Sequence, residues 1–454
     1  MDYKDKKVLI IGAGKSGVAV ALFLIKKGAR VTLADAVCPT GQEGLWARLR
    51  EAGAELYWGG YPEINQGSFA QLVLSPGVPL TAQPVRFAEK AGIPITGEME
   101  LAYQYAKAPI VAITGTNGKT TTTALIGEIF RKSGKTTLVG GNIGLPLVSL
   151  VEGADAQVIV AEVSSFQLET TASFKPKVSV ILNITPDHLD RHGIMENYTA
   201  VKAGILANQQ KGDYAILNYD DPLVAPLNKL TAAQPIYFSR LKKPEGGVFL
   251  EDGYITDDIN GARERVIKAR ELLIPGSHNL ENALAAAAAA RVMGASRETL
   301  AAALGEFPGV AHRLEYVAEI NGVKYINDSK GTNPFATIKA LESYDEPIVL
   351  IAGGRNKGGD FKEFAAALKD KARVLVTLGE SAELIGAAAR EVGFSAIQTA
   401  ADFPAAVQAA AKAARPGEVV LLSPACASWD MFKNFEERGD LFKELVAGMQ
   451  GRKP

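Results

Sequence analysis

The sequence predicts an α/β protein built from three doubly wound, Rossmann-like domains. Its 454 residues exceed the length of one ordinary domain and fit about three. Hydrophobic residues at 47%, charged residues at 22% and 45 glycines are typical of a globular, loop-rich α/β protein. Short apolar runs alternate with helical patterns along the chain, as in domains with a central parallel sheet.

The first segment contains a β-α-β unit. Its expected strands are Val8–Ile11, Val31–Asp35 and Leu72–Leu74. Between the first two strands, a glycine-rich turn is followed by a helical pattern that runs to about Lys27 and ends at Gly28. The pattern fades at 97–108, which we interpret as a linker. We therefore expect a first domain at 1–97.

The second segment restarts the alternation. We expect strands at Pro109–Ile113, Gln157–Glu162, Val178–Asn183 and Tyr214–Asn218, helices at Thr120–Arg131 and Asn279–Met293, and short β excursions within Gly246–Arg270. The segment closes near Pro308–Gly309. We expect the central domain to span 98–309.

The third segment repeats the pattern. We expect strands at Ile348–Ala352, Val374–Leu378 and Val419–Leu422, and helices at 361–370, 381–391 and 403–414. The expected third domain spans 310–454.

Composition excludes several classes of protein. The formal charge is −1 with no long basic block, so we expect no nucleic-acid partner. Cys38 and Cys426 fit no metal or redox spacing and suit a reducing cytosol. The apolar run Ala283–Ala290 is too short to cross a membrane, and the N-terminus has no signal-peptide core. We expect a cytoplasmic monomer without a membrane partner.

A glycine fingerprint follows the first strand. Gly12, Gly14 and Gly17 match G-x-G-x-x-G, and Asp35 ends the next strand, where a ribose-binding acid belongs. This spacing is compatible with a nicotinamide dinucleotide. The same glycines could admit the diphosphate of another nucleotide at the helix N-terminus, or only permit tight packing.

A second glycine loop, ITGTNGKTTT at Ile113–Thr122, ends like a phosphate-binding loop but starts differently. The standard spacing requires glycine at position 113, and the leading glycine here is Gly115. Lys119 could face the β- and γ-phosphates of ATP, and the Thr120 hydroxyl could bind Mg²⁺. A strand before the loop and a helix after it favour a P-loop-type ATPase domain over a turn with a surface lysine.

Two further side chains are expected beside this loop. Glu162 and His188 both follow apolar strands, so both should emerge at the carboxyl edge of the sheet. A carboxylate and an imidazole there could hold Mg²⁺ against substrate oxygens. Alone, His188 could be structural and Glu162 a solvated acid.

Several motifs together resemble the Mur ligases, the ATP-dependent amide-forming enzymes of peptidoglycan precursor synthesis. The motifs are GTNGKT (Gly115–Thr120), EVSSFQLE (Glu162–Glu169), NITPDHLDRH (Asn183–His192) and HRLE (His312–Glu315). NDSKGTN (Asn327–Asn333) and the run Leu422–Gly439 are similar to members that add D-glutamate to UDP-N-acetylmuramoyl-L-alanine. The DNPR motif of the diaminopimelate- or lysine-adding members is absent from the third segment.

The resemblance implies three groups of binding residues. Those for ATP are Gly115, Thr116, Asn117, Gly118, Lys119, Thr120, Thr121, Asn282, Arg313 and Asp328. Those for the UDP-substrate are Gly14, Lys15, Ser16, Gly17, Asp35, Ser75, Pro76, Gly77 and Asn142. Those for D-glutamate are Lys330, Thr332, Lys357, Ser428, Trp429, where some relatives have leucine, and Phe435. Asn282 could instead cap a helix, and Asn142 could be only a turn residue.

The resemblance also implies a mechanism. ATP phosphorylates the alanyl carboxylate, and the D-glutamate amine attacks the acyl phosphate. The catalytic residues would be Lys119, His188 and Lys202. Two Mg²⁺ ions would be held by Thr120, Glu162, His188 and Lys202, the last carbamylated by carbon dioxide.

Other functions stay open on the sequence. Within the same class, the chain could be another Mur ligase or a folate-chain-extending synthase. A nicotinamide-dependent oxidoreductase is supported by the first glycine fingerprint alone. A P-loop regulatory switch is disfavoured by the altered loop spacing.

Overall fold

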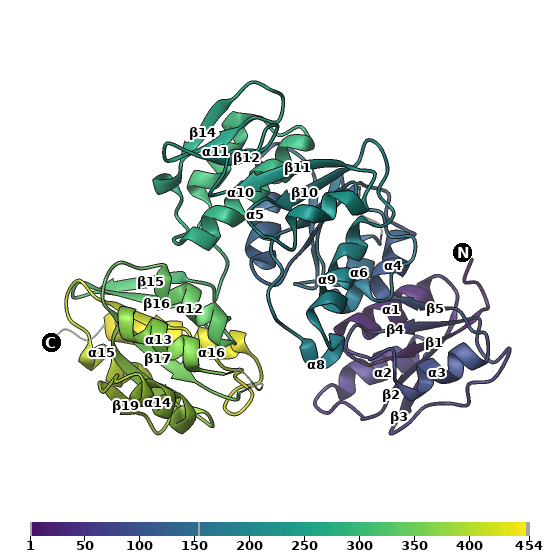
Figure 1. Cartoon of the computed structure of the whole chain (residues 1–454). Helices are drawn as coiled ribbons and strands as arrows, with labels where there is room; N and C mark the ends of the chain where they lie inside the picture. Colours follow the sequence, from purple (N-terminus) through teal and green to yellow (C-terminus); the bar gives the residue numbers. More distant parts are fainter. Residues whose placement is uncertain (1, 153–154, 357, 359, 451–454) are drawn as a thin grey trace. The chain divides into compact units, whose positions relative to one another are not determined.

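The computed structural model describes residues 2–152, 155–356, 358 and 360–450. The chain forms two compact units (Figure 1). The first unit comprises Met1–Ala269 and Glu281–Leu304, and the second comprises Arg270–Leu280 and Gly305–Pro454. The domain boundaries expected at 97/98 and 309/310 stay predictions.

The first unit begins with a parallel five-stranded sheet of order β3-β2-β1-β4-β5. Its strands are β1 (Lys7–Ile11), β2 (Arg30–Asp35), β3 (Glu55–Trp58), β4 (Gln71–Leu74) and β5 (Ile95–Gly97). Helices α1 (Lys15–Lys26) and α2 (Glu43–Glu51) share a core with one face, and α3 (Gln83–Lys90) shares a core with the other. This doubly wound arrangement puts the strand-order switch between β1 and β4, where α/β sheets bind ligands.

The second sheet of this unit has nine strands in the order β14-β13-β12-β11-β10-β9-β6-β8-β7. They are β6 (Ile110–Thr114), β7 (Thr137–Gly141), β8 (Val158–Glu162), β9 (Val178–Ile181), β10 (Tyr214–Asn218), β11 (Gln234–Ser239), β12 (Val248–Glu251), β13 (Tyr254–Asp257) and β14 (Glu264–Lys268). Strand β13 pairs antiparallel with both β12 and β14, and the other pairs of neighbouring strands are parallel. The carboxyl end of β6 lies between those of β8 and β9, so side chains after these strands meet.

Helices of the second sheet follow the expected positions closely. Helix α5 (Lys119–Lys132) packs against β6, β7 and β8. Helix α10 (Ser277–Val292) contains the alanine run Ala283–Ala290, which is fully buried. None of the helices in the described part of the chain combines the length and hydrophobicity needed to span a bilayer.

The linker expected at 97–108 is wrong. Helix α4 (Glu98–Tyr103) occupies much of this stretch, and its first five residues are buried. It packs against α6 (Leu147–Leu150), and one hydrophobic core extends from the first sheet into the second. The two acids of α4 are buried because backbone N–H groups satisfy them: Glu100 accepts hydrogen bonds from three successive residues, Ala172 to Phe174.

Glu98 provides a test of this junction. Its Oε1 accepts a hydrogen bond from the Val148 N–H at 2.7 Å, and its buried Oε2 has no partner in the described structure. Burial raises the pKa of Glu98 from 4.5 to about 7. The fold therefore favours the protonated acid, whose contribution is fully present below pH 4.5 and is lost as the pH rises through about 7.

We expect Glu98→Gln to stabilise the protein at pH 8 by ~3 kcal/mol and to leave it unchanged at pH 4.5. Thermal unfolding at both pH values measures this, with the exposed Glu89→Gln as the matched control. A melting temperature that responds equally to Glu98→Gln at both pH values would show that ionisation of Glu98 plays no part.

The second unit holds a six-stranded sheet of order β15-β16-β20-β17-β18-β19. Its strands are β15 (Glu315–Ile320), β16 (Val323–Asn327), β17 (Ile348–Gly353), β18 (Ala372–Leu378), β19 (Ile397–Thr399) and β20 (Val419–Leu422). Only the edge strand β15 is antiparallel among these strands, and the sequence prediction missed the β15–β16 hairpin.

Helices cover both faces of this sheet (Figure 1). The helices α12 (Pro334–Glu342), α13 (Lys362–Lys371) and α14 (Ala382–Glu391) share a core with Ile348 and Leu350. The helices α15 (Phe403–Ala413) and α16 (Phe435–Gln450) share a core with Val349 and Ile351. Alternate residues of β17 thus face opposite layers, and the functional loops are left to the strand ends.

Candidate active site

The first glycine loop is held tightly between β1 and α1. Gly12 has φ +97°, and its carbonyl oxygen accepts a hydrogen bond from the Ser75 hydroxyl at 2.8 Å. A Cβ at Gly17 would overlap that carbonyl oxygen, so this position requires glycine. Gly14 is the N-cap of α1 and is exposed, with no acidic residue in the first turn. The helix N-terminus is therefore open to an anion such as a diphosphate.

Asp35 orients this loop from the end of β2. Its Oδ2 accepts a hydrogen bond from the Ala13 N–H at 2.8 Å, and its Oδ1 accepts one from the Val37 N–H at 3.1 Å. Four more of the expected UDP-substrate residues lie on neighbouring segments: Lys15 and Ser16 in the first turn of α1, and Pro76 and Gly77 in the turn after β4. All of them lie at the carboxyl edge of the first sheet, around its β1–β4 switch point.

The central loop curls around its own lysine. Gly115 and Gly118 have φ +149° and +85°, which favour glycine. Lys119 Nζ donates to the carbonyl oxygens of Gly115 at 2.9 Å and Thr116 at 2.8 Å. Asn117 N–H donates to Asn183 Oδ1 at 2.9 Å. The loop is shaped by contacts with the segment after β9, and α5 starts directly behind it.

Other expected ATP-binding residues surround the start of α5. Thr120 and Thr121 are buried in its first turn. Asn282 Oδ1 accepts a hydrogen bond from the Thr122 hydroxyl at 3.2 Å and lies against Gly118. Asn282 stands inside α10, five residues after Ser277, so its alternative interpretation as a helix cap is wrong.

Glu162 ends β8 with one carboxylate oxygen engaged. Its Oε1 accepts a hydrogen bond from Asn142 Nδ2 at 2.8 Å. Its Oε2 is buried and has no hydrogen-bond partner in the described structure. A buried carboxylate oxygen without a partner is costly unless a cation or donor completes it. Asn142, beyond being a turn residue, therefore fixes which oxygen of Glu162 is available.

Lys202 lies on α9 (Met195–Ala203) and is only 1% exposed. Its Nζ donates to the Gly115 carbonyl oxygen at 2.8 Å, the same atom that Lys119 contacts. Burial, and then the positive charge of Lys119, hold the pKa of Lys202 well below its ordinary value. The side-chain nitrogens of Lys119 and Lys202 thus donate to the same carbonyl oxygen. The lowered pKa favours the neutral amine at Lys202.

His188 has an unusual backbone. It is the N-cap of α8 (Leu189–His192) with φ 52°, in the left-handed region. Its Nε2 lies 3.5 Å from Asp187 Oδ2, and its ring meets the ring of Phe166 edge-on at 4.8 Å. The side chain is about half exposed at 47%, so its remaining surface is open to a ligand.

The side chains around Glu162 and Lys202 provide only some of the ligands that a Mg²⁺ site usually has. No three His, Cys, Asp or Glu side chains gather around one point in the residues described. The free Oε2 of Glu162 is nonetheless the type of hard oxygen ligand that Mg²⁺ prefers. Conversion of the Lys202 amine into a carbamate would supply further oxygen atoms beside it.

In the second unit, Asp328 follows β16 and is buried. Its Oδ2 accepts a hydrogen bond from the Ser423 hydroxyl at 2.7 Å, and its Oδ1 accepts one from the Leu314 N–H at 3.3 Å. Burial raises its pKa to about 6, against the opposing effect of the Arg313 charge. Arg313 Nε is buried without a hydrogen-bond partner in the described structure, so a donor is available there.

Three loops at the carboxyl edge of this sheet are joined by backbone hydrogen bonds. Ala425 N–H donates to the Gly331 carbonyl oxygen at 2.9 Å, which joins the loops after β20 and β16. Arg355 and Ala427 exchange two backbone hydrogen bonds, which join the loops after β17 and β20. The expected D-glutamate residues that the structure describes belong to the loops after β16 and β20 or to the start of α16.

The side chains of that group differ in exposure. Lys330 Nζ lies 5.4 Å from the centre of the Phe435 ring, and Thr332 lies two residues further along the same loop. Ser428 is buried, whereas Trp429 is 58% exposed. Lys357 lies outside the described residues.

Arg438 is a residue that the sequence reasoning missed. It is only 1% exposed, and its guanidinium donates to the Ser329 hydroxyl, the Ser329 carbonyl oxygen and the Cys426 carbonyl oxygen. Burial lowers its pKa to about 10. Its only sequence signal was its place inside the motif Leu422–Gly439. It ties the loops after β16 and β20 to α16.

We expect Arg438→Ala to lower the free energy of unfolding by ~3 kcal/mol, because it leaves a cavity and buried acceptors without donors. The midpoint of urea unfolding measures this. The exposed Arg390→Ala is the control and should change little. An unchanged midpoint for Arg438→Ala would contradict the anchoring role.

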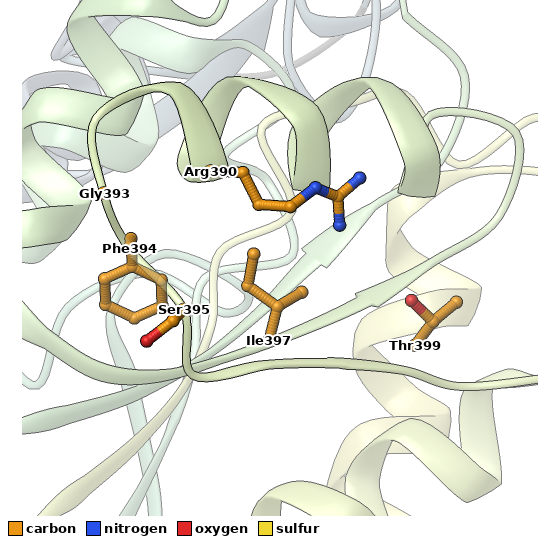
Figure 2. A pocket seen from close by; sticks show the side chains of 6 residues that line it. All are labelled: Arg390, Gly393, Phe394, Ser395, Ile397 and Thr399. Atoms are coloured by element: carbon orange, nitrogen blue, oxygen red, sulfur yellow. The ribbon is translucent and has the colours of Figure 1, made fainter.

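A surface hollow lies elsewhere in the second unit. Figure 2 shows Arg390 and Phe394 at the end of α14 facing Ile397 and Thr399 of β19. The lining extends from Gly393–Ser395, before β19, to Thr399 at the end of this strand. None of the expected site residues lines it.

Three family models match the chain in succession. The model described as Mur ligase MurD-like, N-terminal domain, matches residues 6–97. The Mur ligase middle domain matches 113–290, and the model described as Mur ligase, glutamate ligase domain, matches 312–426.

Curated relatives match over the whole length. A protein of Pelotomaculum thermopropionicum named UDP-N-acetylmuramoylalanine--D-glutamate ligase is 62% identical over 451 residues, which are 99% of each chain. A protein of the same name from Thermoanaerobacter sp. is 46% identical over 453 residues, covering 99% of this chain and 100% of the relative.

Solved structures share the fold. The UDP-N-acetylmuramate-alanine ligase MurC of Thermotoga maritima superimposes with a TM-score of 0.62 at 21% identity, covering 98% of this chain and 100% of that one. The MurF ligase of Thermotoga maritima, in complex with ADP, gives 0.60 at 16% identity, covering 99% and 96%.

Proposed function

The chain belongs to the Mur ligase family, and we propose that it joins D-glutamate to UDP-N-acetylmuramoyl-L-alanine with the consumption of ATP, in peptidoglycan precursor synthesis. The observation that carries this function is the full-length match at 62% identity to a relative that bears that name. The matches to ligase domains leave the oxidoreductase alternative without support.

The first step is phosphoryl transfer to a carboxylate. An oxygen of the alanyl carboxylate attacks the γ-phosphorus of ATP, the bond to the β-phosphate oxygen breaks, and ADP leaves. Two anions must approach, so most of the catalysis is charge neutralisation and positioning. Lys119 supplies a cation at the start of α5, and Gly115–Gly118 offers backbone N–H groups to the phosphates.

Glu162 and the carbamate of Lys202 would supply the negative charges of the site. A lysine must be neutral before its amine can attack carbon dioxide, and the buried position of Lys202 favours that state. Glu162, Thr120, His188 and the Lys202 carbamate would hold two Mg²⁺ ions, which would neutralise charge on the phosphates and the acyl acceptor.

The second step forms the amide. The D-glutamate amine, after losing a proton, attacks the carbonyl carbon of the acyl phosphate. The tetrahedral intermediate then expels inorganic phosphate. We propose that Lys330, Thr332, Lys357, Ser428, Trp429 and Phe435 bind the amino acid, whose two carboxylates require cations and hydroxyl donors.

The proposal assigns the uridine diphosphate of the substrate and ATP to different loops. We propose that the open N-terminus of α1 and the turn Ser75–Gly77 hold the uridine diphosphate, and that Asn142 contacts the muramoyl-alanyl end. We propose that Asn282, Arg313 and Asp328 also bind ATP.

Phosphate release from ATP tests the function. We expect release only when both UDP-N-acetylmuramoyl-L-alanine and D-glutamate are present, with product of the summed mass minus water. A mass-detected screen of amino acids identifies the preferred one. Efficient joining of a different amino acid would overturn the D-glutamate assignment, and a change in reduced-nicotinamide absorbance would revive the oxidoreductase.

A further inference from the structure

Arg191, on α8, connects two loops that come from different sheets of the first unit. Its Nη2 donates to the Val78 carbonyl oxygen at 3.1 Å, and its Nη1 donates to the Gly77 carbonyl oxygen at 3.5 Å. Both acceptors lie in the turn that follows β4 of the first sheet. Helix α8 belongs to the segment that follows β9 of the second sheet.

The adjacent edge of the same guanidinium, formed by Nε and Nη2, is held by an acid. Arg191 Nε lies 3.2 and 3.3 Å from the two carboxylate oxygens of Glu169, and Nη2 also contacts that carboxylate. The side chains of Arg191 and Glu169 are only 14% and 11% exposed. A mostly buried bidentate pair of this kind is geometrically specific, so the guanidinium has one orientation.

One aromatic ring supports both Arg191 and His188. The guanidinium carbon lies 4.7 Å from the centre of the Phe166 ring, and the His188 ring meets the same ring at 4.8 Å. His188 starts α8, three residues before Arg191. Phe166 lies on α7 (Ser165–Leu168), which follows Glu162. The turn after β4 is thus linked through Arg191 to the helix that presents His188.

We propose that Arg191 is a positioning residue that fixes the turn Ser75–Gly77 relative to His188. The inference rests on the proposed function, in which that turn holds the uridine diphosphate and His188 lies at the acyl end. A substrate fixed at its nucleotide would then present its carboxylate at the correct distance from ATP. Arg191 does this through other residues and touches no reacting atom.

The role requires arginine. The planar guanidinium uses one edge for Glu169 and the other for two carbonyl oxygens at once, which needs its fork of N–H donors. A lysine ammonium is a point charge and cannot hold both edges in one geometry. The charge alone is therefore insufficient.

The test compares Arg191→Met and Arg191→Lys with the parent, and with the control Arg86→Met on the exposed face of α3. The assay measures kcat, the KM of each substrate, and the Kd of UDP-N-acetylmuramoyl-L-alanine in the absence of ATP. We expect both Arg191 variants to lose about 30- to 100-fold in kcat at saturating substrate, as a misplaced reactant would cause. The KM of ATP should change little, and Arg86→Met should match the parent. Because removing one partner of a buried ion pair lowers stability, thermal unfolding identifies the temperature at which every variant is folded, and kcat is compared there.

A second variant protects the test against misfolding. Glu169→Gln should produce a similar loss in kcat, and the double variant should lose little more, because both residues act as one unit. An unchanged kcat in Arg191→Met, or a return to the parental kcat in Arg191→Lys, would overturn the inference. If the parent makes no D-glutamate product in the same assay, the proposed function fails instead, and the two failures are distinguishable.

Discussion

Replacing Lys119 by alanine should reduce kcat for ligation by at least about 10³-fold, because in the proposed mechanism this lysine neutralises charge on the transferring phosphoryl group. Hydrogen bonds to two carbonyl oxygens of its own loop hold the Lys119 ammonium within that loop. Phosphate release with all three substrates measures the effect.

The control for this variant is Lys369→Ala, on the exposed face of α13, which should keep the parental rate. Binding of a non-hydrolysable ATP analogue separates a loss of binding from a loss of chemistry. We expect kcat to fall far more than the affinity for the analogue. Ligation by Lys119→Ala at the parental rate would contradict the assignment of this loop to phosphoryl transfer.

Replacing Lys202 by methionine should lower kcat by about 10²- to 10³-fold, since the variant keeps the volume of the side chain but cannot form a carbamate. Removal of dissolved carbon dioxide should lower the activity of the parent, and added bicarbonate should restore it. The variant should respond to neither treatment.

The matched control for Lys202→Met is Lys229→Met, in the same unit. Mass spectrometry under mild conditions should detect the carbamate on the parent and none on the variant. A parent whose rate is independent of carbon dioxide, or a fully active Lys202→Met, would show that Lys202 serves only to pack against the Gly115 carbonyl group.

The sequence predicted the central strands and the helices between them to within a few residues. Strands such as β6, β17 and β20 are buried on both faces, so they are continuous apolar runs bounded by turns. The edge strand β15 was missed because its residues are largely half-buried or exposed, which leaves no apolar run.

The linker error has a different cause. The linker was inferred from a fading pattern at 97–108, a stretch in which Glu98 and Glu100 interrupt the apolar residues. Both carboxylates are instead buried, because distant backbone N–H groups donate to them. Partners at a sequence distance of fifty residues or more leave no local pattern.

The same distinction applies to the candidate site: residues at strand ends could be predicted, and contacts between distant segments could not. Lys119 and Glu162 could be predicted because each follows a strand whose carboxyl end lies at one edge of a parallel sheet. The contact of both Lys119 and Lys202 with the Gly115 carbonyl oxygen could not be predicted, since Lys202 is 87 residues from Gly115 in the sequence. The roles of Arg191 and Arg438 depend on contacts between loops that only the fold brings together.

Transfer of a carboxylate oxygen to phosphate tests the acyl-phosphate mechanism most directly. UDP-N-acetylmuramoyl-L-alanine carrying oxygen-18 in its alanyl carboxylate would be converted with ATP and D-glutamate, and the released phosphate analysed by mass. We expect each phosphate to carry one oxygen atom from the carboxylate. Formation of the amide with phosphate that contains no oxygen-18 would contradict the account.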